Sequence, residues 1–443
     1  MRGAIAAGHP LTAEAGAQVL GEGGNAVDAL LAAAFTAFVT EGPLTGPAGG
    51  GFALVHEPSG RTTMLDCFFQ VPRTPLGEME ELVIDFGDSG TQVFHIGEGS
   101  VAVPGLLAGL ERVHADFGTR AWRELVDPAL VLARDGFERD AQRATLHRIL
   151  EGILLRDDGG RRIYGDPERV RTLDACETLE RVRDLGSGAV AELLPEYAED
   201  LHAYRVLEVQ PLELGVLGRS ILSMPSQGGR VVRRILEILA AHVGEPLLET
   251  EARAVAEAYG PLGSGPLPGT THISVVDAEG TAAALSSTLG SGSGVFRAGT
   301  QLNNMLGELD VIGVGEKEPG VRLASMMTPT LVLDAGRPQL VLGSAGSVRL
   351  AGAIAQVTWR FLRGMHVAAA IAAPRLHVEG TTLHLEGGWQ DREVDALPAS
   401  WDVNRWDDLN LFFGGVQAVE RTRDGAFQAA GDPRRGGVGI VVA

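Results

Sequence analysis

The chain has 443 residues, of which 45% are hydrophobic and 21% charged, and its formal net charge is −20. That balance is typical of a globular protein with a large core or two domains. The negative charge argues against a nucleic-acid backbone or an anionic membrane as partner. Cys67 and Cys176 are the only cysteines, so the sequence implies no disulfide framework and a reducing compartment is expected.

The N-terminal part predicts a buried helix followed by strands. Residues 12–40 are alanine-rich with little polarity, which favours a helix in a core. Their apolar run over 29–39 is too short to cross a bilayer. No basic and apolar leader precedes His9, so we expect a cytoplasmic protein without a membrane segment. Residues 49–55 and 62–69 follow as expected buried strands.

Helical patterns dominate the middle of the chain, and strands return near its end. Residues 105–200 are mostly helical in pattern, with a charged stretch over 155–162 that predicts a solvated loop or helix end, and a further helix is expected over 229–243. A hairpin is predicted from strands at 330–333 and 339–342, and a helix over 350–363 follows it. The pattern contains no internal repeat.

A second hairpin, over residues 259–289, carries the candidate chemistry. A Gly/Pro-rich loop ends at Gly269, and the β-branched strand that follows turns at Ala278-Glu279-Gly280 into another apolar strand. If Asp277 faces Thr281, then Thr270 faces Thr288, with Cβ atoms roughly 4.5–5.5 Å apart. Two hydroxyls at the loop end of a strand suggest catalysis, whereas an ordinary cross-strand threonine pair is the alternative.

Several ordered motifs support the catalytic interpretation. They are His9-Pro10-Leu11, Gly23-Gly24-Asn25-Ala26-Val27-Asp28-Ala29, Gly46-Pro47-Ala48-Gly49-Gly50-Gly51-Phe52, Asp135-Gly136-Phe137, Thr270-Thr271-His272, Ala373-Pro374-Arg375 and Asp432-Pro433-Arg434. With these motifs the chain resembles the γ-glutamyltransferase family of N-terminal nucleophile hydrolases along nearly its whole length. The resemblance implies an α+β fold, a four-layer αββα sandwich.

The resemblance also implies self-cleavage. The Thr270 hydroxyl can attack the carbonyl of Gly269, giving an ester that water resolves. Cleavage leaves a large subunit of 1–269 and a small subunit of 270–443, which together form one domain. The new α-amine of Thr270, with a reference pKa of roughly 7.7–8.0, can serve as the base for its own hydroxyl.

An acyl-transfer enzyme also needs donors aimed at the developing oxyanion. In the family, two adjacent backbone N–H groups at the positions of Gly346 and Ser347 form this hole. The second position is a glycine in relatives and a serine here, which is tolerable because the backbone donates. A plain turn from strand to helix is the alternative interpretation of residues 343–347.

Substrate recognition is where the sequence departs from the family. The resemblance places the substrate-binding groups at Phe68, Gly290, Asn304, Met305, Glu308 and Ser325. Phe68 replaces the arginine that binds the substrate α-carboxylate, and a phenyl ring cannot replace a guanidinium. Gly290 and Met305 replace an asparagine and a glutamine, and Glu308 replaces an aspartate that binds an ammonium. The sequence therefore predicts a pocket that is more apolar than usual.

These observations predict an autoprocessed amidohydrolase or acyltransferase in which Thr270 attacks a small-molecule amide or γ-glutamyl-like substrate. A true γ-glutamyl enzyme whose carboxylate clamp is re-sited is one alternative; Arg73 could supply such a clamp, but we expect it to be a surface arginine. A cephalosporin-type acylase and a non-catalytic binding protein of the same fold are others. We expect His272 to be a packing residue and expect no metal or nucleotide cofactor, and the sequence leaves a further oligomer open.

Overall fold

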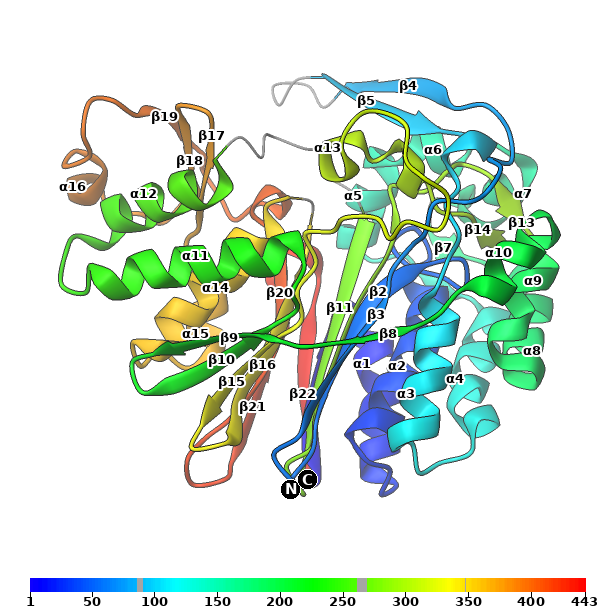
Figure 1. The fold of residues 1–443 in the computed structure, drawn as a ribbon, viewed down its shortest axis with the longest axis horizontal. Coiled ribbons are helices and arrows are strands. Elements are labelled where there is room, and N and C mark those ends of the chain that lie inside the picture. Colours follow the sequence, from blue (N-terminus) through cyan, green and yellow to red (C-terminus); the bar gives the residue numbers. More distant parts are fainter. Residues whose placement is uncertain (86–90, 261–268, 347) are drawn as a thin grey trace.

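Two antiparallel sheets stack face to face in the centre of the computed structural model, which describes residues 1–85, 91–260, 269–346 and 348–443 (Figure 1). The first sheet has the order β22 (Val438–Val442), β1 (Gly3–Ala7), β11 (Gly269–Asp277), β12 (Ala282–Gly290), β2 (Gly50–His56), β3 (Thr62–Cys67) and β8 (Leu207–Val209). The second has the order β21 (Phe427–Ala430), β20 (Gly415–Arg421), β16 (Arg337–Ala345), β15 (Thr330–Asp334), β10 (Arg219–Ser223) and β9 (Leu212–Val216).

Helices cover the outer face of each sheet, as Figure 1 shows. The first sheet is covered by α1 (Pro10–Gly21), α2 (Ala26–Thr40) and α3 (Leu106–Phe117), and α4 (Trp122–Asp135) packs on α2. The second is covered by α11 (Gln227–Ala241), α14 (Leu350–Leu362) and α15 (Val367–Ala372), with α12 (Leu247–Tyr259) beside α11. The expected four-layer αββα sandwich is therefore confirmed.

Shorter elements surround the sandwich. The helices are α5 (Ala141–Ile149), α6 (Glu151–Leu154), α7 (Asp158–Tyr164), α8 (Cys176–Leu185), α9 (Ala189–Leu193), α10 (Ala198–Ala203), α13 (Leu309–Ile312) and α16 (Asp391–Val394). The small sheets are β4 (Glu80–Asp85) with β5 (Thr91–Ile96), β6 (Phe137–Glu138) with β7 (Arg169–Val170), β13 (Phe296–Arg297) with β14 (Thr300–Gln301), and β17 (Leu376–Glu379), β18 (Thr382–Leu385) and β19 (Asp402–Arg405). In the described part of the chain, no helix has both the length and the apolar run that crossing a bilayer requires.

The single helix expected over 12–40 is wrong, because the structure has two helices there. Gly23 adopts a positive φ of 87°, which ends α1, and Asn25 begins α2 with a capping box. The Asp28 N–H donates to Asn25 Oδ1 at 2.9 Å, and the Asn25 N–H donates to Asp28 Oδ2 at 3.0 Å. These reciprocal bonds satisfy backbone donors that have no partner within the helix.

The predicted hairpin over 330–342 and the helix over 350–363 are confirmed as β15–β16 and α14. The hairpin β11–β12 is also confirmed, with Thr271 opposite Ser287 as counted from the sequence. The register shifts between Gly269 and Thr271, so that Gly269 lies opposite Gly290. The expected direct pairing of Thr270 with Thr288 is therefore wrong: a β-bulge takes Thr270 out of the ladder, as bulges next to functional sites often do.

Candidate active site

One cavity collects most of the expected site residues. It has an empty volume of about 330 Å³ and is lined by Phe68, Thr270, Thr288, Gly290, Met305, Glu308, Ser325 and Gly346. Val311, Met326, Met327 and Leu350 complete its walls. These residues come from segments that are distant in the sequence, so the sandwich fold brings them to one end of the paired sheets.

The bond between Gly269 and Thr270 lies at this cavity, and its carbonyl has a polar partner. The Thr288 hydroxyl donates a hydrogen bond to the carbonyl oxygen of Gly269. The Gly290 N–H donates to Thr288 Oγ1 at 2.8 Å, so the same hydroxyl accepts one bond and donates the other. A Cβ on Gly269 would lie 2.8 Å from the Gly290 carbonyl oxygen and 3.0 Å from Leu44 Cα, which leaves room for glycine alone.

The two residues after Thr270 fix the start of β11 from opposite faces. Thr271 Oγ1 donates to the buried carboxylate of Glu41 at 2.6 Å, on the side of the helices. His272 faces the second sheet, with its ring nitrogens 2.8 Å from Ser286 Oγ and 2.9 Å from Ser274 Oγ. Burial lowers the pKa of His272 to about 3, so the ring is neutral and structural, as its sequence context suggests.

The candidate oxyanion hole follows strand β16. Gly346 lines the cavity with a φ of 120°, a conformation that side chains disfavour, so a glycine is required there. The segment leads into α14, whose first turn begins at Leu350. Ser347, the other expected member of the hole, lies outside the described residues.

Glu308 is the ionisable group of the cavity wall. Its Oε1 accepts hydrogen bonds from the Ser291 N–H at 2.9 Å and from Ser291 Oγ at 2.7 Å. Its Oε2 is buried and has no hydrogen-bond partner in the described structure. Burial raises the pKa of this carboxyl group, and none of the described lining residues is a Lys, Arg or His. The free oxygen is therefore available to a positively charged group of a ligand.

Phe68 forms an apolar wall of the cavity, at the position where the resemblance predicts an arginine in other members. Its ring stacks on Phe52 with centroids 5.2 Å apart and meets Phe69 edge to face at 4.9 Å. Arg73 does not compensate for the missing guanidinium, because it is half-exposed and forms ion pairs with Glu199 and Asp200. The structure thus gives no support to a carboxylate clamp at Arg73.

Asn304 differs from its expected role as a substrate contact. It does not line the cavity; its Oδ1 accepts from the N–H groups of Ser291 at 2.7 Å and Gly292 at 3.1 Å. A Cβ on Gly290, whose φ is 69°, would lie 2.2 Å from that same Oδ1. The absence of a side chain at 290 and the inward position of Asn304 therefore depend on each other. The sequence offered no signal for Ser291, which holds Glu308, beyond a run of small residues.

The remaining expected substrate-binding residue, Ser325, lies in the cavity wall. Its Oγ accepts a hydrogen bond from the Met327 N–H at 3.1 Å, and the residue is buried. Because a hydroxyl can accept and donate at once, Ser325 keeps a donor for a ligand.

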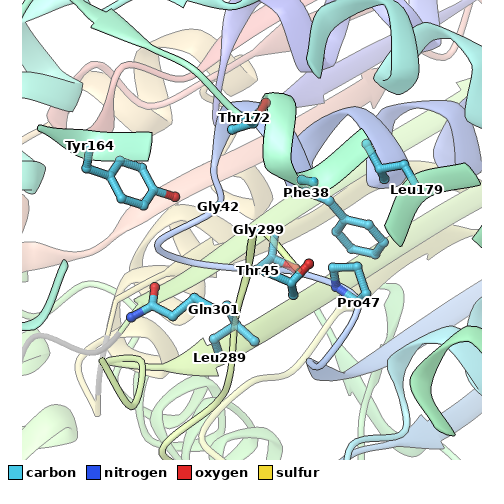
Figure 2. A pocket seen from close by; sticks show the side chains of 13 residues that line it. Phe38, Gly42, Thr45, Pro47, Tyr164, Thr172, Leu179, Leu289, Gly299 and Gln301 are labelled. Carbon is cyan, nitrogen blue, oxygen red and sulfur yellow. The ribbon is translucent and has the colours of Figure 1, made fainter. Parts of the chain in front are cut away.

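Another cavity, of about 380 Å³, lies on the helix side of β12 and contains none of the expected site residues (Figure 2). Figure 2 shows the Tyr164 hydroxyl directed into this space, with Thr45 and Gln301 beside it. The amide of Gln301 is buried without a hydrogen-bond partner among the described residues. A polar cavity of this kind suits ordered water.

Comparisons with known proteins agree with this geometry. The family model described as Gamma-glutamyltranspeptidase matches residues 12–189 and 248–442. The glutathione hydrolase proenzyme of Pseudomonas aeruginosa is 28% identical, over 99% of this chain and 94% of its own. The Acylase ACY 1 proenzyme of Pseudomonas sp. strain SE83 is 26% identical, over 100% and 94%. A crystal structure of cephalosporin acylase from Bacillus halodurans has the same fold, with a TM-score of 0.83 at 20% identity over 99% of this chain and 95% of its own. The chain therefore belongs to the gamma-glutamyltranspeptidase family.

Proposed function

We propose that the chain is a precursor that cleaves itself between Gly269 and Thr270. The observation that carries this proposal is the hydrogen bond from the Thr288 hydroxyl to the Gly269 carbonyl, because it polarises the bond to be attacked. The Thr270 hydroxyl adds to that carbonyl carbon, the C–N bond breaks, and the hydroxyl proton ends on the freed amine. Water then hydrolyses the ester, leaving a carboxylate on Gly269 and regenerating the hydroxyl.

The products are a large subunit of 1–269 and a small subunit of 270–443 that begins with the nucleophile. The α-amine of Thr270 takes the proton from its own hydroxyl as that oxygen attacks the amide of a substrate. The negative charge that develops on the substrate oxygen is stabilised by the N–H of Gly346 and its neighbour. The acyl group then passes from Thr270 to water or to an amine.

The acyl group that this cavity suits has an apolar chain, carries an ammonium and has no carboxylate beside that ammonium. Its apolar part fits the wall formed by Phe68 and Met305, and its ammonium fits the unpaired Oε2 of Glu308. A glutathione-type γ-glutamyl group would bring an α-carboxylate into a cavity whose described walls offer it no cation. We also propose a cytoplasmic location, supported by two cysteines that form no disulfide and testable by fractionation.

Three 4-nitroanilides test the acyl preference, because they differ by one charged group at a time. The γ-glutamyl compound has an ammonium and a carboxylate, the 4-aminobutyryl compound has the ammonium alone, and the butyryl compound has neither. We expect kcat/KM to be highest for 4-aminobutyryl by about 10-fold or more, since a charged hydrogen bond contributes about 1.5–3 kcal/mol. In Glu308→Gln the advantage over butyryl should disappear.

Each other outcome points to a different function. A γ-glutamyl compound that reacts fastest would favour a carboxylate clamp outside the residues that line this cavity. A purified chain that stays uncut and cleaves none of the three would favour a binding protein of the same fold.

A further inference from the structure

A third cavity, with an empty volume of about 1210 Å³, lies between the two sheets at one edge of the sandwich, and we call it the edge cavity. Phe52, Asp66 and Val209 line it from β2, β3 and β8 of the first sheet. On the side of the second sheet, Met224 follows β10 and Gln227 begins α11. The strands β8 and β9 are the last of their sheets, and residues 210 and 211 alone join them, so the two edges lie together (Figure 1).

The edge cavity borders the acyl cavity, which is the cavity that contains Thr270. Val311 and Ser325 line both cavities. An aromatic wall also continues from one to the other, because Phe68 of the acyl cavity stacks on Phe52 of the edge cavity with centroids 5.2 Å apart. A substrate that fills the acyl cavity therefore has further space beside it.

The ammonium site of the acyl cavity lies close to this shared wall. Val311 follows Glu308 by three residues, and its N–H donates to the Glu308 carbonyl oxygen at 3.0 Å. The buried Oε2 of Glu308 is the acceptor without a hydrogen-bond partner among the described residues. A second substituent on the substrate carbon that carries the ammonium would thus start next to the wall that the two cavities share.

The inner walls of the edge cavity are apolar, whereas charged side chains lie at its mouth. Phe52, Met224 and Leu323 line the cavity and are buried. Asp310 and Arg230 also line it, but both are exposed to solvent. Apolar walls of this kind bind apolar groups, because such groups leave water when they enter.

Asp66, the remaining charged residue of the edge cavity, already has partners within the protein. Its Oδ1 accepts a hydrogen bond from the Phe68 N–H at 2.9 Å and lies 3.5 Å from Arg322 Nε. Asp66 therefore does not require a cation from the ligand, and the part of a ligand that enters this cavity needs no charge of its own.

We propose that the edge cavity binds an apolar branch of the acyl group, attached to the carbon that carries the ammonium. This inference rests on the proposed function, in which the ammonium meets Glu308 in the acyl cavity. The acyl cavity then holds the chain from the attacked carbonyl to the ammonium, and the branch passes Val311 and Ser325 into the edge cavity. The substrates are therefore amides of 4-amino acids with a long apolar tail.

Two 4-nitroanilides that differ only in this branch test the inference. The 4-aminobutyryl compound has no branch and the 4-aminooctanoyl compound has a butyl branch, and its two enantiomers are measured separately. The wild-type enzyme should prefer the faster enantiomer over 4-aminobutyryl by about 10-fold or more in kcat/KM, because the added methylene groups leave water.

Two substitutions that fill the edge cavity should remove this preference. Gln227 and Ala324 line the edge cavity but not the acyl cavity, and neither is buried. Gln227→Trp and Ala324→Trp each place an indole ring there and should bring the ratio of the two kcat/KM values close to one. Arg233→Trp is the matched control, because it adds the same ring at an exposed position of α11 outside both cavities and should keep the wild-type ratio.

The ratio is internal to each enzyme, so a lower fraction of matured protein does not change it, and if one filling variant fails to mature, the other decides. A wild-type ratio near or below one, or a wild-type ratio that persists in both filling variants, would overturn the inference. Equal loss of the preference in Arg233→Trp would overturn it as well. Hydrolysis of the unbranched 4-aminobutyryl compound reports separately on the proposed function, because failure of that function abolishes it and failure of the edge cavity as a subsite does not.

Discussion

Removing the Thr288 hydroxyl should slow the cleavage between Gly269 and Thr270 by two to three orders of magnitude. That hydroxyl donates to the Gly269 carbonyl, and its orientation is set by the Gly290 N–H, which donates to it at 2.8 Å. Thr288→Val keeps the shape of the side chain and leaves the developing oxyanion without this donor. Loss of one such donor costs about 2.7–4 kcal/mol, or about 10²–10³ in rate.

The assay follows precursor and fragments by intact-mass spectrometry over time after rapid purification. Thr288→Ser keeps a hydroxyl at the same position and should retain most of the rate. Thr45→Val is a matched control, because Thr45 is equally buried and its Oγ1 lies 2.8 Å from Ser287 Oγ on the other face of the strand. A Thr288→Val precursor that matures as fast as the wild type would refute the role of this hydroxyl. Equal slowing by Thr45→Val would show a general loss of packing instead.

Three further predictions concern the cavity walls, and each uses the uncleaved Thr270→Ala chain as parent. Burial raises the pKa of Glu308 above its ordinary 4.5, so the folded state favours the protonated acid. The stability that this protonation contributes is present at low pH and is lost as the pH rises through the raised pKa. Glu308→Gln should therefore match the parent in Tm below pH 4.5 and exceed it at neutral pH; no gain at neutral pH would contradict this. Phe68→Ala should lower the free energy of unfolding by about 3–5 kcal/mol in urea titrations, and a loss below about 1 kcal/mol would be inconsistent with the observed aromatic packing. Gly290→Ala should destabilise the chain more than Gly313→Ala, because both glycines have positive φ (69° and 78°) but a Cβ at 290 alone would meet a buried oxygen, at 2.2 Å; equal losses would count against that clash.

Local sequence signals predicted much of the fold. The loop at Ala278-Glu279-Gly280 fixed the hairpin register by counting, and Thr271 does lie opposite Ser287. Apolar periodicity also located the hairpin over 330–342 and the helix that follows it. These features depend on contacts between residues close in the chain, which is why a single sequence reveals them.

Features that depend on distant contacts could not be predicted in this way. The bulge at Thr270 arises where the ladder pairs Gly269 with Gly290, and a count along the strand cannot detect it. The inward orientation of the Asn304 side chain depends on the absence of a side chain at Gly290, fourteen residues earlier in the sequence. The approach of Arg435 to Gly346 joins two segments that the antiparallel pairing of β16 with β20 and the contact of Arg435 with Gly415 bring together.

Intact-mass spectrometry of the purified wild-type chain beside Thr270→Ala tests the central claim most directly. The account predicts two wild-type fragments that meet between Gly269 and Thr270, and a single uncut chain in the variant. A wild-type chain that stays whole under conditions in which it is folded would contradict the assignment of Thr270 as an N-terminal nucleophile.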